Sequence, residues 1–225
     1  MPNHSNQGTA DMTSKNINII FLHSLFVFLL SLSAATSASD DVLDLLEQCY
    51  NCHGPHGQSV TPEMPIIAGY SKTYIMDTMT EYRHSERPCH ETRYVSGPHK
   101  GQTDDMCRVA RELSRQETEM IGDNLSREKF IPAQQKFNIE RARRGEKLHN
   151  RMCDKCHEDG GSSPDDDNGI LAGQWVQYVR HQMEEFETGR RPMVKKMKNQ
   201  FDKLDVEDME DLVQYYASLQ QRDKK

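Results

Sequence analysis

The chain is organised by two short stretches, Cys49-Tyr50-Asn51-Cys52-His53 and Cys153-Asp154-Lys155-Cys156-His157. Both have the form Cys-x-x-Cys-His, and they lie 104 residues apart. The same shift also aligns Ile67-Ala68-Gly69 with Leu171-Ala172-Gly173 and Arg87-Pro88 with Arg191-Pro192. Matching residues at one fixed shift indicate an internal repeat, in which a single kind of domain occurs twice.

The repeated motif predicts a specific cofactor. Cys-x-x-Cys-His is the attachment pattern of c-type haem. Two cysteines three residues apart lie on one side of a helical turn, so both sulfurs can reach one porphyrin edge. The histidine that follows is placed to bind the iron as proximal ligand. We therefore predict two covalently attached haem c groups. The attaching cysteines are Cys49, Cys52, Cys153 and Cys156, and the proximal ligands are His53 and His157.

Each copy of the repeat is expected to fold as helices joined by loops. A short amphipathic helix precedes each motif, at residues 41–46 and 139–152. A second helix, with apolar residues three and four apart, follows at about 71–82 and 175–186. The last helix starts after Ser114, which forms a capping box with Glu117, or after Asp205. No strand pattern is evident, so the predicted fold class is all-α. The repeat places the first domain at residues 39–127, a linker at 128–136 and the second domain at 137–225.

The N-terminal residues have the features of an export signal. An apolar run from Ile19 to Leu32 follows Lys15 and is followed by small residues up to Ala38. This pattern predicts a signal peptide over residues 1–38, cleaved after Ala38 or Ala35, with Met12 as an alternative start. An uncleaved anchor is the alternative, but the run is short for the roughly 20 residues of a membrane span. We expect a periplasmic protein without a membrane span after cleavage.

The repeat is interrupted once, by an insertion in the first domain. After Pro88 the match resumes at a shift of 91, so the first copy is 13 residues longer. Cys89 and Cys107 bracket this insertion and are the only cysteines outside the two motifs. Because disulfides persist in oxidising compartments, we predict a Cys89–Cys107 disulfide. Two separate buried thiols are the alternative.

A methionine is the expected second axial ligand of each iron, as is usual in electron carriers. Met106 lies eight residues before Ser114, and Met197 lies eight residues before Asp205. This repeated spacing selects Met106 and Met197 from 12 methionines, and both are expected in a loop that crosses the haem. The alternatives are Met193 at the second haem and His90 or His99 at the first. Met79, Met183 and Trp175 are expected to be core or packing residues.

The charges of the chain bear on its partners. The net charge of -7 and the lack of a basic run argue against a nucleic-acid partner. Basic residues gather around Met197, at Arg190, Arg191, Lys195, Lys196 and Lys198. This cluster is either a docking site that attracts an acidic redox protein or an ordinary solvated loop.

The motifs resemble those of a known family. Two Cys-x-x-Cys-His motifs, each followed by Ala-Gly and a late methionine, are similar to the tandem class I cytochrome c domains of diheme cytochromes c4. The second half also resembles the cytochrome subunit of flavocytochrome c sulfide dehydrogenase, in residues 153–161, 170–175 and 189–197. The resemblance implies two such domains, each wrapped round one haem, in a periplasmic electron carrier. It further implies a flavoprotein partner with FAD, which oxidises sulfide and passes electrons to the haems.

The sequence is compatible with several functions. The favoured one is the electron-accepting subunit of a flavin-dependent sulfide dehydrogenase, and the alternative is a free-standing shuttle to a terminal oxidase. Two six-coordinate irons leave no open substrate site, so no catalytic residue is expected. An enzyme with one open haem, active on thiosulfate or peroxide, would require Met106 or Met197 not to bind iron. Two zinc sites are disfavoured because neither motif has a fourth ligand at the usual spacing.

Overall fold

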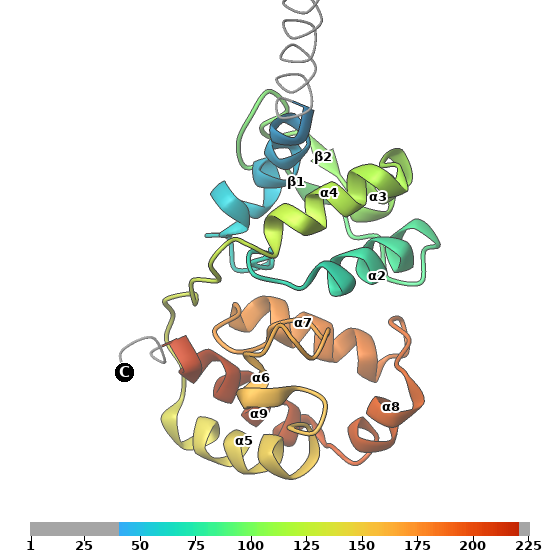
Figure 1. Ribbon diagram of the computed structural model, residues 1–225. Helices are drawn as coiled ribbons and strands as arrows, with labels where there is room; N and C mark the ends of the chain where they lie inside the picture. The colour runs from blue at the N-terminus through green and yellow to red at the C-terminus, as the bar shows by residue number, and fades with distance from the viewer. Residues whose placement is uncertain (1–40, 221–225) are drawn as a thin grey trace, which may run out of the picture. The chain divides into compact units, whose positions relative to one another are not determined.

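The computed structural model describes residues 41–220, and this part of the chain is mostly helical, as predicted (Figure 1). The expected signal peptide, its cleavage sites and Met12 lie outside the described residues. Residues 41–53 are helical and end at the first motif. The elements that follow are η1 (Pro55–Gly57), α2 (Lys72–Arg83), β1 (Thr92–Arg93), β2 (Thr103–Asp104), α3 (Met106–Glu112), α4 (Arg115–Leu125), α5 (Ile139–Met152), α6 (Glu158–Gly161), α7 (Val176–Glu187), α8 (Lys195–Phe201) and α9 (Val206–Ser218).

The first domain packs α2 against α3 and α4. Ser71 caps α2 by accepting a hydrogen bond from the backbone N–H of Tyr74 at 3.0 Å. The predicted capping box of Ser114 and Glu117 is present at the start of α4. Arg83 at the end of α2 donates hydrogen bonds to the carbonyls of Ala110 and Leu113, both at 3.0 Å, and so connects α2 to the end of α3. Met79 is buried in α2, as expected of a core residue.

The second domain is built around the crossing of α5 and α9. Gly145 of α5 lies directly against the backbone carbonyl of Asp211 in α9, an approach that a larger residue would block. Asp205 caps α9 in a capping box with Asp208, at the predicted helix start. The core of this domain joins residues from α5, α7 and α9, namely Leu148, Val179, Leu212, Val213, Tyr215 and Tyr216, with Met183 packed against it.

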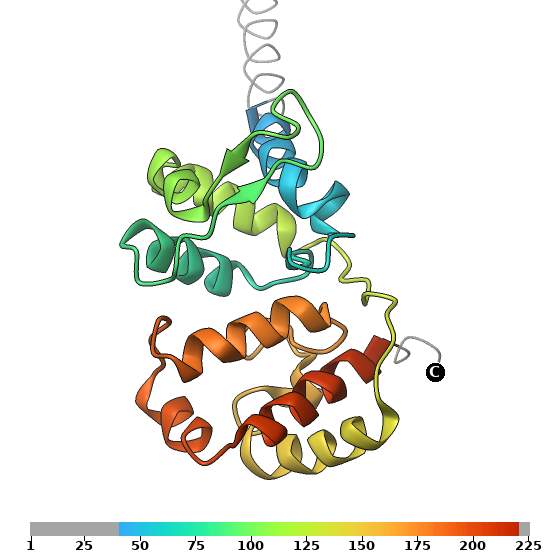
Figure 2. The same cartoon turned by 180° about the vertical axis from the view of Figure 1, so that it is seen from behind.

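The insertion in the first domain contains a short hairpin that the sequence did not predict (Figure 2). Strands β1 and β2 pair antiparallel, with Thr92 opposite Asp104 and Arg93 opposite Thr103. Strands of two residues are too short to give an alternating pattern. The predicted Cys89–Cys107 disulfide is confirmed, and it closes a loop with a sequence separation of 18.

The linker is packed against both domains. Residues 129–138, which overlap the expected linker at 128–136, contain no helix or strand. Gly69 and Gly173 both have positive φ, 74° and 76°, which glycine adopts without strain. A Cβ at Gly69 would lie 3.1 Å from Phe130, and one at Gly173 would lie 2.5 Å from Pro132. Both Ala-Gly turns therefore need glycine because the linker passes over them.

Among residues 41–220, no helix is long and apolar enough to cross a membrane.

Candidate haem sites

The first motif lies at the end of a helix, with its histidine oriented by a loop. His53 is buried, and its Nδ1 lies 3.0 Å from the carbonyl oxygen of Pro65. Because a carbonyl can only accept a hydrogen bond, Nδ1 carries the proton and Nε2 keeps a lone pair for a metal. Burial lowers the pKa of His53, although the hydrogen bond to Pro65 partly opposes this shift. The ring is therefore neutral and fixed, as a proximal ligand requires.

The inserted hairpin packs on the first motif, a contact that the sequence did not reveal. The carbonyl of Asn51 accepts hydrogen bonds from the backbone N–H groups of Val95 at 2.8 Å and Ser96 at 3.2 Å. The Ser96 hydroxyl also donates to the side-chain oxygen of Asn51 at 3.2 Å. Asn51 is a variable position within Cys-x-x-Cys-His, so the motif gives no signal for this contact. The insertion thus covers part of the first site.

The second motif forms a turn instead of continuing a helix. Helix α5 ends at Met152, and the backbone N–H groups of Cys156 and His157 both donate to the carbonyl of Cys153 at 3.0 Å. Among the described residues, the buried Nδ1 of His157 has no hydrogen-bond partner. By the 104-residue shift, Gly169 takes the place that Pro65 has in the first domain. The two histidines therefore differ in how they are oriented.

The donor set of both motifs fits covalent haem. All four motif cysteines are free thiols, so none is lost to a disulfide. Burial raises the pKa of Cys49 to about 12 and that of Cys153 to about 11, so both are protonated thiols at neutral pH. Each pair lies beside a histidine whose pKa is lowered by burial. Two thiols and one neutral imidazole in each domain match what a haem c group needs.

The two candidate methionine ligands lie in short helices, so the prediction that they occupy loops was wrong. Met106 is the first residue of α3, and Met197 lies within α8; both side chains are half-buried. Asp105 caps α3 by accepting a hydrogen bond from the backbone N–H of Arg108 at 2.9 Å. Helices of seven residues are too short for a clear periodic pattern. Iron ligation by Met106 and Met197 stays a prediction.

The alternative iron ligands have different surroundings in the structure. His99 is exposed, with its Nδ1 3.3 Å from the side-chain oxygen of Gln102. His90 pairs through Nε2 with Glu185 of α7. Met193 lines a cavity of about 440 Å³ at the junction of α7, α8 and α9, and Met197 does not. Met193 therefore remains the alternative to Met197, whereas His90 is engaged elsewhere.

Two sequence comparisons identify the family. Residues 140–215 match the family model described as cytochrome C oxidase, cbb3-type, subunit III. Cytochrome c-554(548) of Halomonas halodenitrificans is 31% identical over 75 residues, which cover 33% of this chain and 90% of that protein. The chain belongs to the cytochrome c family. The region matched by the family model lies in the second domain, and the cofactor of this cytochrome c is covalently bound haem c.

Solved structures extend the likeness to the whole described fold. Cytochrome c4 of Acidithiobacillus ferrooxidans has a TM-score of 0.61 at 24% identity, covering 77% of this chain and 99% of that chain. Reduced cytochrome c4 of Pseudomonas stutzeri has a TM-score of 0.63 at 24% identity, and the match covers 80% of this chain and 97% of that chain. Thiosulfate dehydrogenase of Marichromatium purpuratum has a TM-score of 0.58 at 22% identity, and the match covers 76% of this chain and 36% of that chain. The fold is that of two tandem class I cytochrome c domains, and with two motifs the chain carries two haem c groups.

Proposed function

We propose that this cytochrome c transfers electrons between redox proteins in the periplasm and has no substrate site of its own. The observation that carries the proposal is the duplicated Cys-x-x-Cys-His motif, set in two domains of cytochrome c fold. When bound, haem c supplies reversible one-electron chemistry. The chain supplies the thiols that anchor each group and the neutral imidazoles of His53 and His157. Met106 and Met197 would complete the ligand set of each haem and would keep water and small substrates from its iron.

The partner we favour is a flavoprotein with FAD that oxidises sulfide. Support comes from the resemblance of residues 153–161, 170–175 and 189–197 to the cytochrome subunit of such an enzyme. A free-standing shuttle is the second candidate, and it is favoured by the match to cytochromes c4 over 97–99% of their length. The likeness to a thiosulfate dehydrogenase supports a redox enzyme as partner more generally.

Purification from the native source with partners intact tests these alternatives. A flavin that co-elutes with two haems per chain and is reduced by sulfide supports the dehydrogenase subunit. Haem without flavin, together with oxidation by a membrane terminal oxidase, supports the shuttle. A ferrous spectrum that changes with carbon monoxide would contradict the electron-transfer proposal, because it would reveal an iron with an open position.

The docking surface is expected at the start of α8. Of the five basic residues predicted to gather there, Arg190 pairs with Glu184, Arg191 lies over the ring of Phe186 and Lys198 pairs with Asp202. Among the described residues, Lys195 and Lys196 have no ion-pair partner, and both are exposed. These two lysines are thus available to attract an acidic redox partner.

Charge reversal tests the docking surface. We predict that Lys195→Glu with Lys196→Glu slows partner reduction about tenfold at low ionic strength, because the variant repels an acidic partner. The difference should shrink at high salt, which screens exposed charges. Lys136→Glu with Lys147→Glu makes the same change in net charge, in the linker and in α5, and is the control. Equal stopped-flow rates for the two double variants would rule out docking at α8.

A further inference from the structure

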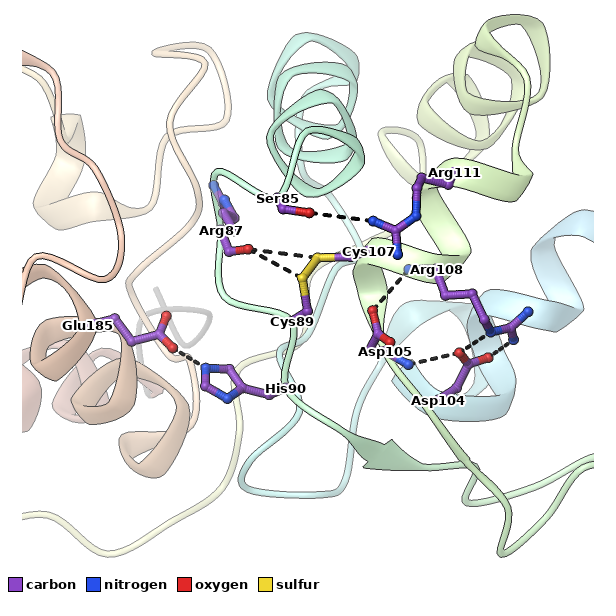
Figure 3. The surroundings of a disulfide bond; sticks show 10 residues. All are labelled: Ser85, Arg87, Cys89, His90, Asp104, Asp105, Cys107, Arg108, Arg111 and Glu185. Carbon is purple, nitrogen blue, oxygen red and sulfur yellow. Dashed lines mark hydrogen bonds and ion pairs between the residues drawn. A yellow bond between two sulfur atoms is a disulfide. The ribbon is translucent and has the colours of Figure 1, made fainter.

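Two histidines and a glutamate meet between the inserted loop of the first domain and α7 of the second. They are His90, His181 and Glu185, and one ligand atom from each lies within 4.8 Å of the others. Figure 3 shows His90 reaching from the loop next to the Cys89–Cys107 disulfide to the carboxylate of Glu185. The disulfide therefore fixes the backbone beside His90. None of these three residues belongs to a haem motif.

The geometry of the cluster suits a cation bound by three side chains. His181 and Glu185 are four residues apart on α7, so they share one face of the helix. The distance from His181 Nε2 to Glu185 Oε1 is 3.5 Å, close to the roughly 3.4 Å between two ligands of a tetrahedral zinc ion. His90 Nε2 contacts the same carboxylate oxygen, and the two imidazole centroids are 4.6 Å apart. A small change of the His90 rotamer would place all three atoms round one ion.

The charge of Glu185 supplies the physical reason for a cation. Its side chain is only 2% exposed, and a buried carboxylate is costly unless a positive charge compensates it. The equivalent residue in the first domain, Glu81, pairs with Arg87. In the second domain, Arg191 instead donates to the side-chain oxygen of Gln182 at 2.6 Å. Among the described residues, the ion-pair partners of Glu185 are His90 and His181, and no lysine or arginine pairs with its carboxylate.

We propose that His90, His181 and Glu185 bind a divalent cation of the zinc type. Two imidazole nitrogens and one carboxylate oxygen are a donor set that zinc prefers, whereas magnesium and calcium favour oxygen ligands. The side chains of His90 and His181 are 50% and 41% exposed, so water can reach the fourth position. The bound ion would hold the inserted loop against α7. This site is independent of the proposed electron transfer and of its partners.

Metal binding to the intact diheme protein tests the site. After treatment with a chelator, the protein is dialysed against Zn²⁺ and its metal content is measured by mass spectrometry. We expect one saturable Zn²⁺ per chain and no Mg²⁺ binding at the same concentration. His90→Asn and His181→Asn should each weaken Zn²⁺ binding by more than about tenfold, since even the loss of a residue that only supports a ligand costs that much. His99→Asn, in the same loop but outside the cluster, should bind as the unaltered protein does.

Unchanged Zn²⁺ affinity in both histidine variants would overturn the proposal, as would the lack of a saturable site in the unaltered protein. If a variant fails to fold, a second measurement on the unaltered protein decides whether these histidines bind Zn²⁺. Zn²⁺ should protect His90 and His181, but not His99, from modification by diethyl pyrocarbonate, read by peptide mass spectrometry. Equal modification of His90 and His181 with and without Zn²⁺ would also overturn the site.

Discussion

The two histidines of the haem motifs occupy equivalent positions of the repeat but have different surroundings. His53 is held by the carbonyl of Pro65, whereas the buried Nδ1 of His157 has no partner among the described residues. The motif alone predicts that both histidines are proximal ligands. It does not predict the difference, because the orientation of an imidazole depends on a loop that reaches it in the folded chain. The sequence also does not predict the contact of Asn51 with the insertion, because Asn51 is a variable position of the motif.

The predicted methionine ligands give a testable expectation for single residues. We expect Met106→His and Met197→His each to lower the reduction potential of one haem by on the order of 100 mV, because methionine ligation raises it. Each variant should also halve the far-red absorption that methionine-ligated ferric haem shows. Spectroelectrochemical titration of the holoprotein measures both effects.

Met193→His is the control for the second haem, and the potential should stay unchanged. A shift of potential in Met193→His but not in Met197→His would assign the ligand to Met193 instead.

At the scale of elements, the long helices were predictable and the short ones were not. The predicted second helices at about residues 71–82 and 175–186 correspond to α2 and α7, and the helix predicted at 139–152 is α5. Their length gives several turns of apolar spacing, and Ser114 and Asp205 mark helix starts through side-chain caps. Helices α3 and α8 and the hairpin β1–β2 are held by contacts with the rest of the domain, so local sequence gives no comparable signal.

The crossing of α5 and α9 gives a second prediction. We expect Gly145→Ala to lower the free energy of unfolding by about 2 kcal/mol, because its Cβ would collide with the backbone carbonyl of Asp211. The higher helix propensity of alanine, about 1 kcal/mol, opposes this loss but does not cancel it. Urea denaturation of the holoprotein measures the change. Glu146→Ala, on the exposed face of the same helix, should change the midpoint little, and equal midpoints for both variants would contradict the close packing.

The contact between α7 and α9 gives a prediction about pH. Arg180 donates two hydrogen bonds to Glu210, at 2.8 and 2.9 Å. Burial alone would raise the pKa of Glu210, but the hydrogen bonds from Arg180 and Gln214 outweigh it, so the pKa is lowered. A carboxyl group with a lowered pKa in the folded state stabilises the protein above its unfolded pKa of about 4.3. This stabilisation is lost as the pH falls through the lower, folded pKa.

We therefore predict that Glu210→Gln costs about 0.5–1 kcal/mol at pH 7, a range that allows for the solvent exposure of Arg180. The cost should disappear at an acidic pH below the lowered pKa of Glu210, where its carboxyl group is neutral. Urea midpoints of the variant and the unaltered protein at both pH values measure it, with Glu146→Gln as a control. A cost that is equal at both pH values would show that the charge of Glu210 does not contribute.

At the scale of the whole molecule, the two domains are joined by polar contacts that only the folded chain brings together. Gln174 is fully buried, accepts a hydrogen bond from the backbone N–H of Ile66 at 3.1 Å and donates to the hydroxyl of Tyr70 at 2.8 Å. Trp175 donates to the carbonyl of Ser59 at 3.0 Å, which agrees with its expected packing role. The linker residues Phe130 and Ala133 belong to the hydrophobic cluster that also contains Ile66 and Trp175.

Gln174→Ala tests this interface. We expect it to lower the free energy of unfolding by about 2 kcal/mol, because the buried N–H of Ile66 would lose its hydrogen-bond partner. Amide hydrogen exchange should also become faster at Ile66 while the core of α5 and α9 stays protected. Gln177→Ala, an exposed position of α7, is the control. Unchanged exchange at Ile66 in Gln174→Ala would show that the domains do not depend on this contact.

The sequence by itself determined the duplicated domain and the covalent haem c cofactor, and it favoured the pairing of Cys89 with Cys107 over two separate thiols, which the structure then confirmed. It could do so because thioether attachment, helix caps and a repeat are all encoded in residue types at fixed spacing. Only the tertiary structure decided that the insertion packs on the first motif, that the linker packs against both Ala-Gly turns and that His90 meets His181 and Glu185. These contacts join residues far apart in the chain, and their free energy comes from burial and from pairing polar groups in the folded state.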